Sequence, residues 1–187
     1  MQDITKFIKK VSRYGFQDFF EIVGELSSES VKKGNLSRLQ KELITLGIAE
    51  YKKCHRCIEI HTAAATKLDA TQNEFSLVRK VILFVQSPPN KDDFLMEDWV
   101  ESWRHYSYSR INERQLLREF LALAVAIIKQ REDLIRLHML AAIEAGAKIE
   151  QIYEIIPIVL LMDGAPTLSQ IPILVTCFDD YEKKNKN

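Results

Sequence analysis

The sequence has few cysteines, no excess of charge of either sign and no long apolar run. Three cysteines among 187 residues cannot staple a fold of this size, and two of them share one Cys-x-x-Cys. The 26 basic and 26 acidic residues balance, so composition does not favour a nucleic-acid-binding protein. The most apolar stretch, residues 152–162, contains Glu154 and Pro157 and is shorter than the roughly 18 residues expected of a membrane span. We therefore expect neither a nucleic-acid partner nor a membrane span.

Apolar residues make up 47% of the chain, which is enough for a substantial core without disulfides. The N-terminal segment MQDITKFIKKVSRYG lacks the unbroken apolar core of a secretory signal. We therefore expect a cytoplasmic protein, in which a Cys-x-x-Cys serves redox or metal chemistry more often than it forms a structural disulfide.

Apolar residues recur with helical spacing, and no alternating strand pattern is present, so the sequence predicts an all-α fold. Ser37 with Gln40 and Thr71 with Glu74 have capping-box spacing, which marks two helix starts. Prolines at 88 and 89 break the chain between two halves. The predicted helices cover residues 3–13, 16–33, 37–53, 54–68, 71–84, 92–110, 113–129, 133–145 and 149–162.

The two halves resemble each other when the second is aligned with the first so that Leu39 falls on Leu116. The alignment matches apolar positions along both halves, and it places Glu42 on Glu119 and His61 on His138. Cys54, however, falls on Arg131, so the second copy keeps the scaffold without the thiols. An internal duplication explains this pattern, and a chance alignment of alanine- and leucine-rich helices is the alternative.

We accordingly predict a single all-α domain over residues 1–187. It comprises N-terminal helices in 1–35, a first repeat with the cysteine pair in 36–86, a connector in 87–112 and a degenerate second repeat in 113–180.

The candidate chemistry lies on Cys54, Cys57, His61 and Glu42. Cys54 stands where a loop enters a helix, and unpaired N–H groups there stabilise a thiolate. The i, i+3 spacing brings both sulfurs to one side of the first turn, close enough for a disulfide if the local geometry permits. His61 follows Cys57 by one helical turn and can exchange a proton with a thiol. Glu42 lies on an apolar helix face, where a carboxylate needs a partner, and His61 is the partner we predict.

Three other features have structural interpretations. Trp99, Trp103 and Tyr106 form a helical stripe that we assign to core or subunit packing, with a substrate-pocket wall as the alternative. Cys177 is interpreted as a small core residue. Glu119 and His138 are expected to form a structural pair, because no thiol accompanies them.

The segment KELITLGIAEYKKCHRCIEIHTAAA resembles the signature of the alkylhydroperoxidase D and carboxymuconolactone decarboxylase family. The resemblance rests on the joint spacing of Glu42, Cys54, Cys57 and His61, and MDGAPTLSQIPIL resembles the family's turn before its closing helix. It extends over residues 36–86 and 113–175.

This resemblance implies a fold of repeated helical units and a homo-oligomer, commonly a trimer or hexamer. It implies a dithiol–disulfide cycle without a bound cofactor, acting on a hydroperoxide or disulfide substrate in antioxidant defence. The implied partners are a peroxiredoxin and a lipoyl-type reductant. Cys57 would be the thiol beside the His61–Glu42 relay, and Cys54 would be the second redox thiol.

One position departs from the family pattern. Peroxidase members often carry a histidine immediately before the second cysteine, where this chain has Arg56. A histidine is found instead at His55, after the first cysteine. His55 and Arg56 are therefore auxiliary candidates, and the peroxidase efficiency is not predicted.

Two other functions are compatible with the same residues. Cys54, Cys57 and His61 could bind zinc, but the second ligand pair of a typical structural site is absent from the sequence. The chain could also be a non-catalytic helical oligomer. We favour the thiol oxidoreductase, which predicts no stoichiometric metal.

Overall fold

The computed structural model describes residues 4–108 and 113–186, and all regular elements within these ranges are helical. The predicted all-α fold is confirmed. The last residues of the helix predicted over 92–110 lie outside the described residues.

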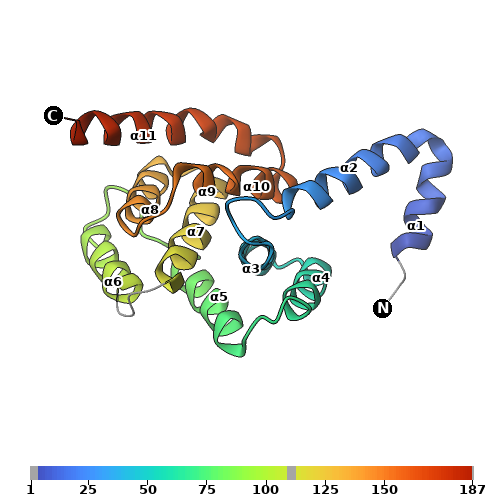
Figure 1. Cartoon of the computed structure of the whole chain (residues 1–187), viewed down its shortest axis with the longest axis horizontal. Helices are drawn as coiled ribbons and strands as arrows, with labels where there is room; N and C mark the ends of the chain where they lie inside the picture. Colours follow the sequence, from blue (N-terminus) through green and yellow to red (C-terminus); the bar gives the residue numbers. More distant parts are fainter. Residues whose placement is uncertain (1–3, 109–112, 187) are drawn as a thin grey trace.

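The helices follow the order labelled in Figure 1. Their bounds are α1 Ile4–Val11, α2 Gln17–Ser30, α3 Arg38–Tyr51, α4 His55–Thr66, α5 Gln72–Val85, α6 Met96–Tyr108, α7 Glu113–Ile128, α8 Glu132–Glu144, α9 Ile149–Tyr153, α10 Ile155–Asp163 and α11 Ile171–Asn185, with a kink at Ser12–Phe16 and a short turn of helix at Ala165–Gln170.

Helices α3, α4 and α5 recur in the second half, in the same order, as α7, α8 and the α9–α10 pair. The backbone repeats in detail: Lys53 and Gln130 are both left-handed, with φ of 55° and 54°. The next residues, Cys54 and Arg131, each donate their N–H to the carbonyl five positions earlier, at 3.0 and 3.2 Å. Chance similarity of helical patterns does not account for matched turns of this kind, so the two repeated units are confirmed.

Helix α3 lies at the centre of the first unit and packs against α4, α5, α7 and α10. Every residue from Lys41 to Ala49 is buried, including the charged Lys41 and Glu42. Buried charges need partners inside the protein, so these two side chains determine which other residues must approach α3.

The predicted aromatic packing is also confirmed. Phe84 of α5 lies against Trp99, Trp103 and Tyr106 of α6, with ring centroids 5.4, 5.3 and 5.9 Å away. Cys177 is 2% exposed and belongs to the same hydrophobic core, as expected of a small buried side chain.

The helix predicted over 149–162 is divided at Glu154 into α9 and α10. Pro157 has no N–H to donate to the carbonyl of Tyr153, so the helix cannot run through without a break. The apolar periodicity continues across the break, which is why the sequence pattern alone indicates one helix.

The break places Glu154 against the start of α3. Its carboxylate accepts the backbone N–H groups of Asn35 and Leu36 at 2.6 and 3.0 Å, and Lys41 Nζ lies 2.9 Å away. Burial alone would raise the pKa of Glu154, but the hydrogen bonds from Lys41, Leu36 and Asn35 outweigh it and lower the pKa from 4.5 to about 2. This ion pair therefore joins the two repeats.

Glu154→Gln should lower the free energy of unfolding by about 2 kcal/mol at neutral pH, because Lys41 would stay buried without its counter-charge. A carboxyl with a lowered folded-state pKa stabilises the fold above its unfolded pKa of 4.5 and loses that contribution as pH falls towards about 2. As pH falls from 4.5 to about 2, Glu154→Gln should therefore lose less stability than the wild-type protein does. Urea unfolding at several pH values measures both effects.

Glu29→Gln is the matched control, because Glu29 forms an exposed pair with Lys32 at 3.2 Å. Exposed pairs contribute little, so this change should stay within about 0.5 kcal/mol of wild type. Equal stabilities of the Glu154 and Glu29 variants would contradict the structural role assigned to Glu154.

Helices α1 and α2 form an N-terminal arm, defined as residues 4–30, that extends from the helical body (Figure 1). Large apolar side chains on the arm are exposed, including Phe7, Phe19, Ile22 and Leu26 at 50–61%. Among the described residues, the main contact of the arm with the body is that of α2 with α10. Short helices in water are marginal without packing, so an arm of this kind needs a further contact.

Within the described ranges, no helix combines the length and apolar character that crossing a membrane requires.

Candidate active site

Glu42 is the buried carboxylate of the first repeat, and α3 holds it in place. The helix starts with the predicted capping box, in which Ser37 and Gln40 bond to each other's backbone N–H. Glu42 follows after one turn, on the side that faces α4, with its side chain 4% exposed. Arg38, one turn earlier, brings its Nε to 3.9 Å from Glu42 Oε1.

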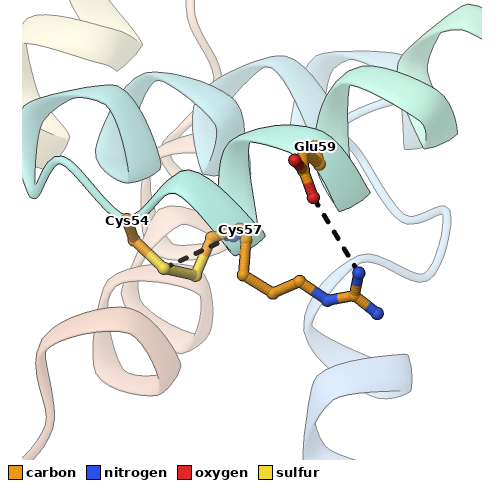
Figure 2. The surroundings of a disulfide bond; sticks show 4 residues. Cys54, Cys57 and Glu59 are labelled. Atoms are coloured by element: carbon orange, nitrogen blue, oxygen red, sulfur yellow. Dashed lines mark hydrogen bonds and ion pairs between the residues drawn. A yellow bond between two sulfur atoms is a disulfide. The ribbon is translucent and has the colours of Figure 1, made fainter. Parts of the chain in front are cut away.

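The cysteine pair begins α4. Lys53 turns the chain through a left-handed conformation, and Cys54 then becomes the N-cap residue of the helix. Its sulfur accepts the N–H of Cys57 at 3.4 Å, as Figure 2 shows. The Cα atoms of the two cysteines are 5.3 Å apart, and the sulfurs are joined in a disulfide. The helix start therefore supplies backbone N–H groups to Cys54 when it is a thiolate.

His61 lies one turn beyond Cys57 on α4, with its side chain 16% exposed. Its Nδ1 is 2.8 Å from Glu42 Oε2. An ionised carboxylate can only accept a hydrogen bond, so this contact places a proton on Nδ1 and leaves Nε2 of the neutral ring free to accept one. The predicted Glu42–His61 contact is present.

A cavity of about 530 Å³ opens beside this pair. Ile60, Ala64, Ile158 and Leu161 give it apolar walls, and His61 lies at its surface. The end of α2 and the segment that follows it, residues 27–33, close another side. A small hydrophobic molecule could therefore reach the imidazole without entering the core.

The two auxiliary candidates lie on the outer side of α4. His55 is exposed, and Arg56 directs its guanidinium to Glu59, at 3.8 Å (Figure 2). Lys52, just before the turn, forms an ion pair with Asp163 of α10. Part of the positive charge near the cysteines is therefore matched by nearby carboxylates.

A family model described as the carboxymuconolactone decarboxylase family matches residues 17–90 and 101–171. The chain belongs to this family. The first matched segment contains the first repeat and begins at α2, earlier than residue 36, where the predicted resemblance begins. The second segment covers most of the second repeat and ends at residue 171. No curated protein and no solved structure matches the chain.

The second repeat of this carboxymuconolactone decarboxylase family member keeps the carboxylate–imidazole contact. His138 Nδ1 lies 2.9 Å from Glu119 Oε2, and both side chains are at most 1% exposed. Trp103 Nε1 donates to Glu119 at 3.1 Å, and the hydroxyl of Ser107 donates to the same carboxylate. Helix α6 thus seals this pair from solvent, and the pair contacts no thiol.

Arg131 takes the N-cap position that Cys54 has in the first repeat. Its guanidinium bonds Asp133 at 2.6 Å and the Pro89 carbonyl at 3.1 Å. In the second repeat, the Arg131–Asp133 ion pair therefore stands where the first repeat has the cysteine pair, and the predicted loss of the thiols is present.

Sequence reasoning missed Arg38 and the residues of 27–33 that close the cavity. Arg38 stands four residues before Glu42, an i, i+4 spacing that could have identified the pair. No local pattern places residues 27–33 on the same cavity as α4, because that arrangement depends on tertiary packing. Within the described part of the chain, no group of three or more His, Cys, Asp or Glu side chains is arranged to hold a metal ion.

Proposed function

We propose that the chain is a thiol-dependent oxidoreductase that reduces hydroperoxides or disulfides through Cys54 and Cys57. The observation that carries this proposal is the bonded cysteine pair at a helix start, one turn from an imidazole held by a buried carboxylate. Membership of a family that contains enzymes is consistent with it.

The reduced enzyme would act on a hydroperoxide in two steps. His61 Nε2 takes the proton of the Cys57 thiol, and the thiolate attacks the terminal oxygen of the hydroperoxide. The O–O bond breaks, the alcohol leaves with that proton, and Cys57 becomes a sulfenic acid. Cys54 then attacks the Cys57 sulfur, water leaves, and the disulfide forms. In sum, two thiols and one hydroperoxide give a disulfide, an alcohol and water.

A dithiol of the lipoyl type would restore the enzyme by thiol–disulfide exchange, with a peroxiredoxin as a second disulfide substrate. We place this cycle in antioxidant defence in the cytoplasm. Glu42 keeps His61 in the tautomer whose Nε2 accepts a proton, and it stabilises the imidazolium that results. His55 and Arg56 would modulate the cysteines by charge.

The proposal is tested by a redox titration of the purified protein, with intact-mass readout of the Cys54–Cys57 state. We expect a reversible two-electron transition at that pair, followed by hydroperoxide consumption when a dithiol reductant is supplied. A pair that stays reduced under mild oxidants would contradict the redox proposal. Stoichiometric zinc retained by the reduced protein would support the metal-binding alternative instead.

We also propose that the chain is a homo-oligomer, a trimer or hexamer, with the N-terminal arm in the interface. The arm exposes apolar side chains on two helices of opposite charge. The basic residues of α1 are Lys6, Lys9 and Lys10, and the acidic residues of α2 are Asp18, Glu21, Glu25 and Glu29. Such segregation suits pairing between arms of different copies.

Phe19→Glu should therefore reduce the oligomer, because Phe19 is 61% exposed on the apolar face of the arm. Light scattering at micromolar concentration measures the mass of both forms. A wild-type mass near the 21.7 kDa of one chain would refute the oligomer proposal.

A further inference from the structure

A second cavity, of about 230 Å³, lies among α5, α6 and α7 and shares no lining residue with the cavity beside His61. Three cationic side chains line it: Lys80 of α5 and Arg114 and Arg118 of α7. Asn73 and Ser76 add neutral polar groups to the same wall. None of the acidic side chains that the structure describes lines it, so its described lining is positively charged.

Arg118 is the unusual member, because it is 4% exposed and has no carboxylate partner among the side chains that the structure describes. One guanidinium nitrogen donates to the Ser107 carbonyl at 2.6 Å, and its Cζ lies 5.1 Å from the centre of the Tyr106 ring. Its Nε is buried without a hydrogen-bond acceptor. A buried cation with only neutral partners is costly, which indicates that an anion is missing from its surroundings.

The internal repeat shows what kind of group is missing. In the alignment that places Glu42 on Glu119, Arg118 corresponds to Lys41 and Leu77 corresponds to Glu154. In one half, the buried Lys41 pairs with the Glu154 carboxylate at 2.9 Å. In the other half, the buried cation is kept, but the carboxylate position is Leu77, and the cavity lies beside it.

We propose that this cavity binds a small multivalent oxyanion, carrying carboxylate or phosphate groups, in place of the carboxylate that Leu77 lacks. Arg118 would hold one group of the ligand at the buried end of the cavity, with two N–H donors suited to paired oxygens. Lys80 and Arg114 are exposed and have no ion-pair partner within the described ranges, so they would bind its outer charge. The ligand would tie α5 to α7 and thereby stabilise the folded chain.

The experiment measures the binding of inorganic phosphate and of citrate to the full-length protein, by calorimetry and by thermal unfolding at constant ionic strength. We expect at least one probe to bind with one site per chain and to raise the unfolding midpoint above that in chloride. Phosphate alone would identify a phosphate ligand, and citrate alone a polycarboxylate.

Two variants test whether the probe binds in this cavity, and a third is the control. Leu77→Glu restores the carboxylate found in the other half, so it should raise stability without ligand and weaken probe binding at least about tenfold. Lys80→Gln removes one charged contact and should weaken binding about tenfold. Lys184→Gln removes an exposed charge near the end of α11 and should leave affinity unchanged.

Probe binding that is absent, or that is equal in wild type, Lys80→Gln and Leu77→Glu, would overturn the proposal. If Leu77→Glu does not fold, Arg114→Gln takes its place in the comparison, because that residue lines the cavity from the surface.

Discussion

Replacing Cys57 by Ser is expected to abolish dithiol-driven hydroperoxide turnover. A serine hydroxyl at this position is not ionised near neutral pH and cannot form a bond to Cys54. Cys54→Ser should have the same effect on turnover for a different reason. Its remaining thiol could still react once with a hydroperoxide, but no second sulfur would release the oxidised product.

The two variants are therefore distinguished by single-turnover mass spectrometry. Oxidant should leave Cys54→Ser with a sulfenic acid on Cys57, and Cys57→Ser should react far more slowly. Peroxide consumption in the presence of a dithiol reductant measures the steady state. Cys177→Ser is the matched control, because Cys177 is buried in the core and distant in sequence from the pair. Wild-type turnover in Cys54→Ser or in Cys57→Ser would contradict the dithiol proposal.

The part of the site that the sequence predicted consists of contacts with a local cause. Glu42 and His61 are 19 residues apart and lie on consecutive helices of one hairpin. A carboxylate on an apolar helix face must find a donor, and His61 on the next helix was the partner that the sequence predicted. Cys54 at the helix start follows from the same local reasoning, since the loop before it ends α3.

The contacts that the sequence did not predict join segments that are far apart. Glu154 appeared only as an interruption of an apolar run, whereas it binds the chain 118 and 119 residues earlier. Its role depends on the break near Pro157 and on how the two repeats face each other. Helical periodicity contains neither kind of information, because it reports one face of one helix.

Arg118, which has no carboxylate partner among the described side chains, is understood only when the repeat and the structure are compared. Its correspondence to Lys41 can be read from the sequence once the two halves are aligned. The consequence becomes visible only when Lys41 is seen to pair with Glu154 and Arg118 is seen to be buried without such a partner. Both repeats therefore have a buried cation at this position. In the first repeat Lys41 pairs with a carboxylate, and in the second Arg118 has neutral partners among the described residues.

Replacing His61 by Ala should slow turnover by roughly 10² to 10⁴ near neutral pH, the usual range for losing a general base. The thiol must then ionise with only the help of the helix start. The defect should shrink as pH rises towards the ordinary thiol pKa of about 8.5, because the thiolate then forms without a base. Steady-state rates across pH 6 to 9 measure both the size of the defect and its slope.

Glu42→Gln should act in the same direction as His61→Ala but less severely. The amide can still accept the Nδ1 proton of His61, so the ring keeps its tautomer, but the amide does not stabilise the imidazolium by charge. Glu119→Gln in the second repeat is the matched control for turnover, since its histidine faces no thiol, although its burial predicts a loss of stability. A His61→Ala enzyme with wild-type rates throughout this pH range would remove the imidazole from the mechanism. The disulfide cycle would survive that result, because both cysteines lie at the start of α4, where the helix terminus stabilises a thiolate independently of His61.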